Sequence, residues 1–218
     1  MMVTNEMNPY LSIIVMLLVG LLIGAWQGFW IAYVRIPPFI VTLAGMLVFR
    51  GLSNVVLEGM TLAPMPDNFL ALFNNYIPDF FGMEGFNMTC FLVGVVVCVL
   101  YVFMVLKGRD SRAKKGYRVE PFGGVLIKMI VICAAVLAFM FRLAQYKGIP
   151  NSLVWIVLVI AVYTYIASKA TVGRYFYAVG GNEKATKLSG INTEKVFFWV
   201  YTNMGILSAI AGIVLSAR

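Results

Sequence analysis

Histidine is absent from the 218-residue chain, and the three cysteines, Cys90, Cys98 and Cys133, all lie within apolar runs. Without imidazole, the sequence has few means of building a metal site or a His-based nucleophile. Cysteines in apolar runs usually behave as small hydrophobic packing residues. No GxxxxGK(S/T) phosphate-binding motif occurs either. We therefore expect no catalytic residue, no metal site, no cofactor and no ATP binding by this chain itself.

Charged residues are also scarce, at 12% of the chain, whereas 61% of its residues are hydrophobic. A soluble domain could not bury so much apolar surface, so this composition indicates a membrane protein. The formal net charge is +8. Because the basic residues cluster beside apolar runs, positive-inside topology explains this charge better than nucleic-acid binding does. We expect contact with membrane lipid and none with nucleic acid.

The apolar runs predict an all-α, polytopic transmembrane bundle of about six spans. A helix needs about 20 predominantly apolar residues to cross a bilayer. Five runs meet or nearly meet this length, and a sixth stops at the chain end. The six runs are Tyr10–Val34, Phe39–Leu57, Thr89–Leu106, Val125–Phe141, Leu153–Ala167 and Phe197–Ala217.

The distribution of Lys and Arg predicts the orientation of these spans. No basic residue occurs from Gly51 to Leu106, and the long loop in that stretch carries Glu58, Asp67, Asp79 and Glu84, so we expect it outside. The connection after residue 106 and the segment 168–195 are rich in Lys and Arg and are expected in the cytoplasm. Counting back places Arg35 inside and the amino terminus outside.

The chain start is unusual for a complete polytopic protein. Its first 34 residues hold no Lys or Arg, so they lack the basic region of a signal peptide. An external terminus requires a helix upstream or an unusual insertion route. We therefore expect residues 1–218 to be a partial transmembrane domain, incomplete at both ends. We also expect that it does not function alone and that its packing seams lack partners.

Small residues recur at every fourth position of the first run, at Gly20, Gly24 and Gly28. This spacing predicts a stripe against which another helix packs closely, although glycine is also simply frequent in membrane helices. Pro37 and Pro38 then interrupt the helical pattern. The break is either an interrupted helix that lines a cavity or an ordinary turn at the membrane surface.

The second run carries polar residues within an apolar span. Arg50, Asn54 and Glu58 share one helical face. An arginine in a span must face water, pair or reach the interface, so Arg50 lines a pathway, pairs with Glu58 or snorkels. The residues considered for a substrate path are Phe39, Thr42, Arg50 and Asn54.

The segment between the last two runs has a different chemistry. Gly180, Gly181 and Asn182 suggest a turn, and EKATKL then favours a helix that Gly190 ends. Asn192 or Thr193 would cap the next helix. The local pattern therefore predicts a short cytoplasmic helix framed by glycines.

Two long segments resemble a known family. IPPFIVTLAGMLVFRG (Ile36–Gly51) and GRYFYAVGGNEKATKLSGIN (Gly173–Asn192) are similar to signature segments of bacterial monosaccharide ABC importer permeases of the ribose and xylose group. GAWQGFWIAYVRIP and YKGIP are most similar to the xylose or multiple-monosaccharide type. The resemblance implies that residues 1–218 form a partial permease domain that does not import sugar alone. It also implies that this domain belongs to a multi-pass subunit of the bacterial inner membrane that forms the translocation path for a monosaccharide.

The resemblance also implies partners. Such permeases pair with a second permease subunit, here expected to form a homodimer, and receive sugar from a periplasmic or lipid-anchored binding protein. Two cytoplasmic ATPases drive them, so ATP hydrolysis belongs to a partner chain and this chain is not expected to be an enzyme.

Residues 173–195 resemble the family's cytoplasmic coupling loop. The residues implied in ATPase contact are Gly181, Asn182, Glu183, Lys184, Ala185, Leu188, Ser189 and Gly190. Counting back from Gly190, Lys184, Ala185 and Thr186 occupy the places of the family's Glu-Ala-Ala pattern, so two of these positions differ from it. A role for a carboxylate there is in doubt unless Glu183 supplies it.

Three rival classes are considered beside this one. A membrane enzyme would have few catalytic groups, because the chain has no histidine and no cluster of carboxylates on one helix. A secondary transporter would need ion-coupling groups within the spans, and no acidic residue lies mid-span. A structural membrane subunit is the simplest alternative. The sequence does not identify which sugar is carried.

Overall fold

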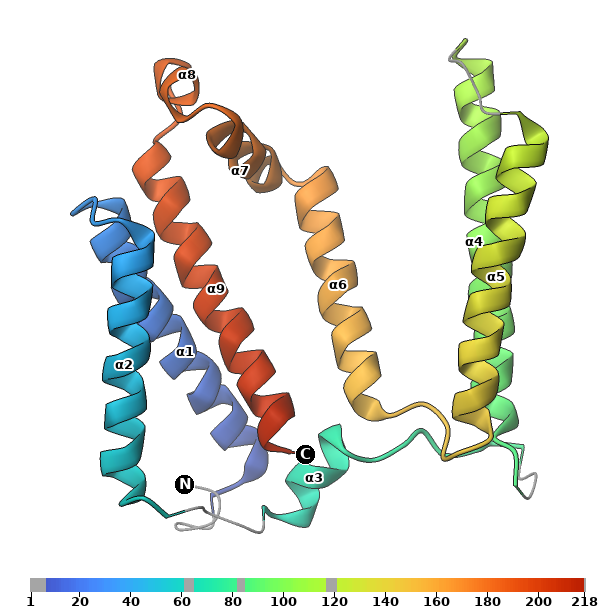
Figure 1. Cartoon of the computed structure of the whole chain (residues 1–218), viewed down its shortest axis with the longest axis horizontal. Helices are drawn as coiled ribbons and strands as arrows, with labels where there is room; N and C mark the ends of the chain where they lie inside the picture. The colour runs from blue at the N-terminus through green and yellow to red at the C-terminus, as the bar shows by residue number, and fades with distance from the viewer. Residues whose placement is uncertain (1–6, 61–64, 82–84, 117–120, 218) are drawn as a thin grey trace. The chain divides into compact units, whose positions relative to one another are not determined.

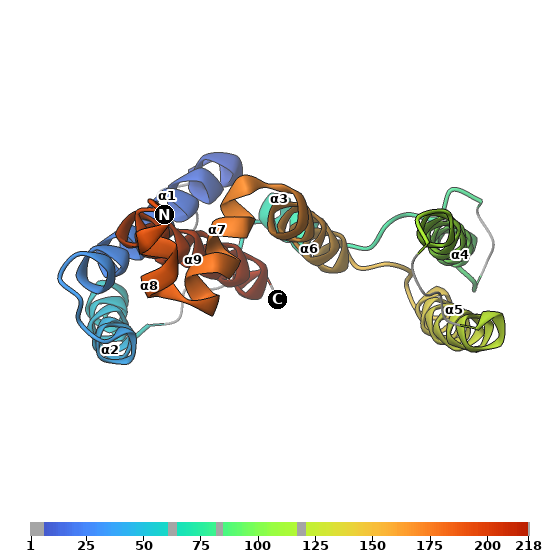
Figure 2. The ribbon, with the colours of Figure 1, turned by 90° about the horizontal axis from the view of Figure 1, so that it is seen from above.

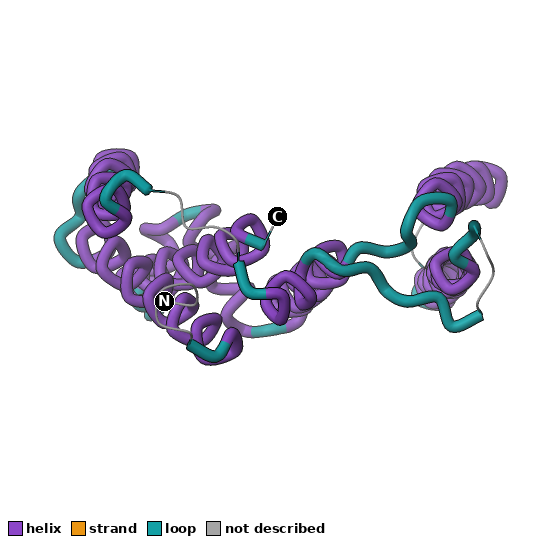
Figure 3. The backbone as a smooth tube through the Cα atoms, turned by 90° about the horizontal axis from the view of Figure 1, so that it is seen from below, coloured by secondary structure: helices purple, strands orange, loops and turns teal. Residues whose placement is uncertain are grey.

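The structure, a computed structural model, describes residues 7–60, 65–81, 85–116 and 121–217. Within these ranges it is built from helices, with no strand (Figures 1 and 3). Six of the described helices are long and apolar enough to cross a membrane, which confirms the predicted all-α polytopic fold. The helices are α1 (Pro9–Ala32), α2 (Pro38–Leu57), α3 (Asp67–Phe73), α4 (Met88–Lys114), α5 (Phe122–Ala144), α6 (Asn151–Lys169), α7 (Thr171–Gly181), α8 (Glu183–Leu188) and α9 (Thr193–Ser216).

The chain forms two compact units. One comprises Met1–Asn74 together with Trp155–Arg218, and the other comprises Asn75–Val154. The expectation of a single partial permease domain over residues 1–218 stays a prediction.

In the first unit, α1 and α9 pack side by side along their lengths, and α2 runs antiparallel to α1 (Figure 1). Figure 2, seen from above, shows α7 and α8 beside the upper end of α9. The contacts of α7 and α8 with α9, and of Glu194 with Arg35, bring residues 173–195 to the same end of the first unit as the α1–α2 turn.

The double proline starts a new helix. Helix α1 ends at Ala32, Arg35 lies in the left-handed region at φ 63°, and α2 begins at Pro38. Proline suits the first helical turn because its missing N–H would have no partner there. The chain therefore reverses in a turn between two spans, and the alternative of an interrupted helix is wrong.

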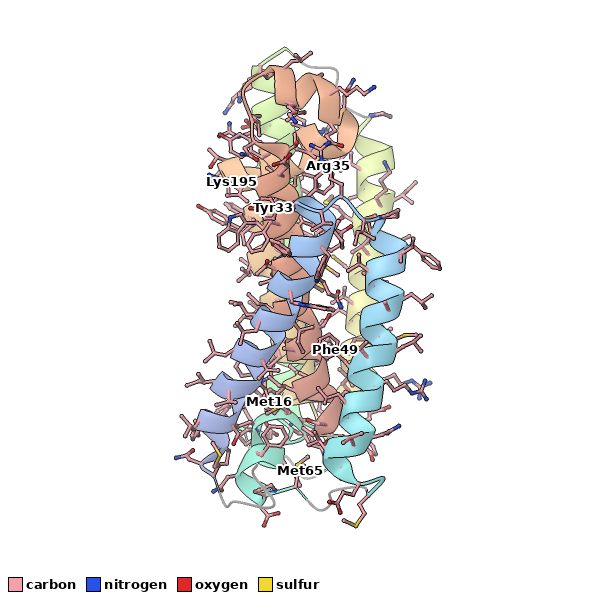
Figure 4. All side chains as sticks on the ribbon, turned by 90° about the vertical axis from the view of Figure 1, so that its left-hand side faces the viewer. Met16, Tyr33, Arg35, Phe49, Met65 and Lys195 are labelled. Carbon is pink, nitrogen blue, oxygen red and sulfur yellow. The ribbon has the colours of Figure 1, made fainter. Side chains whose placement is uncertain are left out.

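The loop expected outside contains a helix that the sequence pattern did not predict. Helix α3 buries Phe69, which is 0% exposed, and Phe73 against Ile213 of α9 and Ala217, which follows α9. Seven residues are too few to show a helical period, so the signal is weak. This packing holds α3 at the end of α9 opposite Arg35, as Figure 4 shows for Met65 and Arg35. The loop that contains α3 and the turn that contains Arg35 thus lie at opposite ends of the first unit, as expected from the distribution of charge.

The second unit is centred on the α4–α5 hairpin. Cys90 lies in its core with Met140 and Ala144, and Cys98 is also buried. The described structure has all three cysteines free. Helix α4 continues beyond the apolar run at Leu106 to Lys114, because helix formation does not stop where hydropathy falls.

Asp79 contributes to capping the amino-terminal end of α4. Its carboxylate accepts a 2.7 Å hydrogen bond from the Thr89 hydroxyl and further bonds from the backbone N–H groups of Phe81, Met88 and Thr89. These donors, the hydroxyl foremost, lower the pKa of Asp79 to about 2. Of the other acidic residues expected in this loop, Glu84 lies outside the described residues.

Candidate functional site: a short exposed helix and a cavity between spans

Helix α8 is only six residues long and is fixed at both ends. The Asn182 side-chain oxygen accepts a 3.0 Å hydrogen bond from the Ala185 N–H, and the Thr186 hydroxyl donates to the Asn182 carbonyl at 2.8 Å. After Ser189, Gly190 turns the chain at φ 84°, a conformation that L side chains resist. The predicted short helix ending before Gly190 is therefore present.

The two preceding glycines lie elsewhere than the pattern suggested. Gly180 and Gly181 are the last residues of α7 and do not form the turn; Asn182 does, as the cap of α8. Sequence reasoning missed α7 as a separate helix. The start of α7 packs closely against the end of α6. A methyl group added at Gly173 would lie only 2.8 Å from the Ala167 Cα, so glycine is needed at this contact.

Most of α8 faces away from the protein. Thr186 is its one buried residue, at 6% exposure, whereas Ala185 and Leu188 are exposed. Leu188 is 89% exposed and Ser189, which follows it, is also exposed. Gly181, Asn182, Glu183 and Lys184 are exposed too. Leu188 is therefore an exposed apolar side chain on a capped helix that also carries the exposed Lys184 and Lys187.

Two polar contacts join this segment to the rest of the first unit. The Thr193 hydroxyl lies 3.4 Å from the Glu183 carboxylate, so Glu183 has a partner within the chain. The next residue, Glu194, accepts a 2.8 Å hydrogen bond from the Arg35 guanidinium in the α1–α2 turn. Hydrogen bonding and charge attraction from Glu194 raise the pKa of Arg35. Figure 4 shows Arg35 at the end of the unit that carries α8.

The glycine stripe of α1 lies against α9. A methyl group at Gly24 would lie 2.8 Å from the Thr202 carbonyl oxygen, and one at Gly28 would lie 3.0 Å from that of Phe198. Gly20 similarly approaches Gly205 and Ala209. The expectation that this seam lacks a partner is wrong, because α9 of the same chain fills it. Only residues without side chains allow the two backbones to approach this closely.

A cavity of about 660 Å³ lies along the same helices, between α1, α2 and α9. Its polar lining comes from Gln27 of α1, Thr42 of α2, and Tyr201 and Ser208 of α9. Sequence reasoning included Thr42 and missed the other three. The amide of Gln27 is an available signal, because a polar side chain within an apolar span usually has a function.

The remaining residues considered for a substrate path lie apart from this cavity's lining. Phe39, Arg50 and Asn54 are exposed on α2. Both Arg50 and Glu58 are described by the structure, and no ion pair joins them; Glu58 instead ends α2 in a left-handed conformation. The pairing alternative for Arg50 is therefore wrong, and its pathway and snorkelling alternatives stay open.

No group of three or more acidic or cysteine side chains able to hold a metal occurs in the part of the chain that the structure describes.

Six candidate spans, a capped helix projecting at the end with the α1–α2 turn, and a partly polar cavity between spans define a polytopic membrane protein. The chain belongs to the family described as "Branched-chain amino acid transport system / permease component", which matches residues 1–218.

Individual relatives are sugar permeases. The chain is 35% identical over 208 residues to the xylose transport system permease protein XylH of Escherichia coli (strain K12), covering 95% of this chain and 51% of the relative. The Haemophilus influenzae protein of the same name is 33% identical, with 95% and 53% covered. The ribose import permease protein RbsC of Haemophilus influenzae is 28% identical, with 100% and 47% covered.

These relatives confirm the resemblance to the ribose and xylose group. Together with the six candidate spans, they indicate a multi-pass protein of the inner membrane. The chain spans about half the length of the curated relatives it matches. No solved structure matches it.

Proposed function

We propose that this chain is part of the permease of an ATP-driven monosaccharide importer. In this proposal α8 docks on a cytoplasmic ATPase, and the spans of the first unit contribute to the sugar path. A periplasmic or lipid-anchored binding protein delivers the sugar, and a second copy of the permease completes the translocation unit. ATP hydrolysis takes place in the partner chain.

The exposed face of α8 carries this proposal. Ala185, Leu188 and Ser189 are all exposed and lie within one helical turn, whereas Thr186 points into the protein. Lys184 and Lys187 flank this apolar face. A small apolar patch with a charged rim matches the usual composition of a protein interface.

The contacts behind α8 support a role as a lever. Force applied to α8 reaches α9 through its short connection and the Glu183–Thr193 contact, and it reaches the α1–α2 turn through Glu194 and Arg35. Both routes end on helices that line the cavity. A rigid element that moves as a unit can transmit a displacement to the spans it connects.

Ala185→Glu tests the docking surface in vesicles that contain the complete permease, its ATPase and the binding protein. A carboxylate forced into a packed contact loses its water without gaining a partner, so sugar-stimulated ATP hydrolysis should fall by about tenfold or more. Leu188→Ala should lower it less, because it removes apolar contact area only.

Lys187→Ala is the matched control on the same helix and should have a mild effect, because a charge at the rim contributes little. Gly190→Val should impair coupling, since a β-branched residue resists the left-handed turn. Insertion is checked by membrane yield. If Ala185→Glu keeps wild-type stimulated hydrolysis and uptake, α8 is a solvated connector and the docking assignment is wrong.

The same vesicles separate the rival classes. Uptake that follows an ion gradient without ATP would indicate a secondary transporter. A complex that takes up sugar equally well without this subunit would indicate a structural one.

A further inference from the structure

Gln27 places an amide in α1 against the backbone of α2. A methyl group at Gly45 would lie 3.3 Å from the Gln27 side-chain carbonyl carbon, so the amide occupies the space that the glycine leaves. The side chain is half-buried and lines the cavity between α1, α2 and α9. None of the residues that the structure describes forms a hydrogen bond with this amide.

A primary amide offers two donors and an acceptor, and an apolar span supplies none of the water that would satisfy them. Polar side chains in spans therefore pair across helices or face a wet cavity. Because Gln27 lacks a partner within the described chain and borders a cavity, its hydrogen-bonding groups are available to whatever enters that cavity.

The rest of the lining narrows the chemistry of the occupant. The cavity residues include no Asp, Glu, Lys or Arg, so nothing there would offset the charge of an ionic solute. The Thr42 hydroxyl donates to the Pro38 carbonyl at 2.9 Å, which leaves its oxygen free to accept. Ser208 offers an exposed hydroxyl, and Tyr201 a flat ring.

Size and surface also favour a small neutral ligand. About 660 Å³ lies within the range typical of small-molecule sites. Val15, Val19 and Ile23 line the cavity and supply apolar surface beside the polar groups. A ring with one apolar face and vicinal hydroxyl groups matches this combination, because the amide places a donor and an acceptor side by side.

We propose that Gln27 binds neighbouring hydroxyl groups of a neutral monosaccharide as it passes between α1, α2 and α9. This assignment rests on the proposed function and adds a binding residue to it. The amide selects for polyhydroxylated solutes, since a site built to hydrogen-bond a hydroxyl discriminates strongly against an analogue that lacks it.

A cysteine probe tests the proposal. Met204→Cys, at an apolar position of the cavity lining, is introduced into the complete permease after the native cysteines are replaced, and its uptake is measured first. Xylose and ribose are then tested for protection of the Met204→Cys thiol against a small alkylating reagent in vesicles. We expect the transported sugar to slow labelling by about tenfold when its concentration is roughly ten times its dissociation constant.

Gln27→Leu removes the amide at similar size, and it should raise the half-protecting sugar concentration by about tenfold through lost hydrogen bonds. Gln27→Asn keeps the amide on a shorter side chain, so its half-protecting sugar concentration should lie between those of the wild type and Gln27→Leu. Gln145→Leu is the matched control, because Gln145 is the other glutamine of the chain and lies exposed at the end of α5. It should leave protection unchanged.

The outcomes separate the two proposals. If the wild-type complex takes up no sugar on ATP addition, the proposed function fails, and the binding assignment with it. If uptake is ATP-driven but sugar never protects the Met204→Cys thiol, the assignment to this cavity is wrong and the proposed function stands. A thiol unreactive even without sugar would show that a lipid chain or another helix fills the cavity, which also overturns it. Unchanged sugar protection in Gln27→Leu would overturn the assignment of Gln27 as a binding residue. If that variant also expresses poorly, the role of Gln27 is packing against Gly45 alone.

Discussion

Gly205→Ala would place a methyl group into the closest approach of α1 and α9. The added carbon would lie 2.7 Å from the Gly24 Cα and 2.9 Å from the Gly24 nitrogen, and it would also meet the Gly20 carbonyl oxygen. All three are backbone atoms, so no side chain can rotate away. We expect this variant to weaken the packing of α1 against α9.

The size of the effect follows from the displacement required. Ordinary van der Waals contact begins at 3.4 Å, so α9 would have to move by roughly 0.7 Å from the Gly24 Cα. A gap of this size removes a quarter to a half of the van der Waals attraction of each contact along the seam. Overpacking in well-packed interiors typically costs about 1–3 kcal/mol of stability. Alanine also favours helix over glycine by up to about 1 kcal/mol, which masks part of the loss.

Gly212→Ala corrects for that propensity, because Gly212 lies on the same helix and an added methyl group there would meet no atom within 4 Å. Both variants are unfolded by SDS titration in mixed micelles, with tryptophan fluorescence as the readout. Gly205→Ala should be less stable than Gly212→Ala by about 1–3 kcal/mol. Equal stability of the two, within about 0.5 kcal/mol, would refute the seam as a close-packed contact.

The remaining predictions concern charge and orientation. Arg35→Glu and Glu194→Arg should each reduce sugar-stimulated ATP hydrolysis in vesicles, and the double exchange should restore it by rejoining opposite charges; a double variant no better than either single one would contradict this. In a cysteine-free background, Asp67→Cys should react with an impermeant maleimide from outside whereas Lys187→Cys should not, and the reverse pattern would overturn the orientation. Asp79 has a lowered pKa of about 2, so its capping is fully present above its ordinary value near 4 and is lost as pH falls towards 2. Hydrogen exchange at the start of α4 should therefore stay slow from pH 7 to 4 after correction for intrinsic rates, but be faster throughout in Asp79→Asn.

The spans could be predicted because hydropathy is a property of consecutive residues and needs no knowledge of tertiary contacts. The same holds for α8, whose ends are fixed by Asn182 and Gly190 within the local sequence. Helix α3 could not, since its seven residues owe their place to Phe69 and Phe73 packing on α9. The local sequence pattern of α3 gives no information about that contact between distant residues.

The sequence alone also could not show which helices far apart in the chain pack against each other. The stripe at Gly20 and Gly24 indicates a close neighbour, but nothing in it points to Gly205, and the ion pair of Arg35 with Glu194 joins residues 159 positions apart. Gln27 was accessible in principle as an amide in an apolar run, yet its lack of a partner becomes visible only when the surrounding helices are in place.

The caps of α8 also bear on how quickly a partner can bind. A six-residue segment is too short to remain helical in water on its own, because helix nucleation is unfavourable. Here Asn182, Thr186 and Gly190 hold it formed before any encounter. The entropy of ordering this backbone is thus lost during folding of the permease and not again during association. If α8 docks on an ATPase as proposed, two preformed surfaces meet, so the association rate should depend on diffusion and charge, without a slow folding step at the interface.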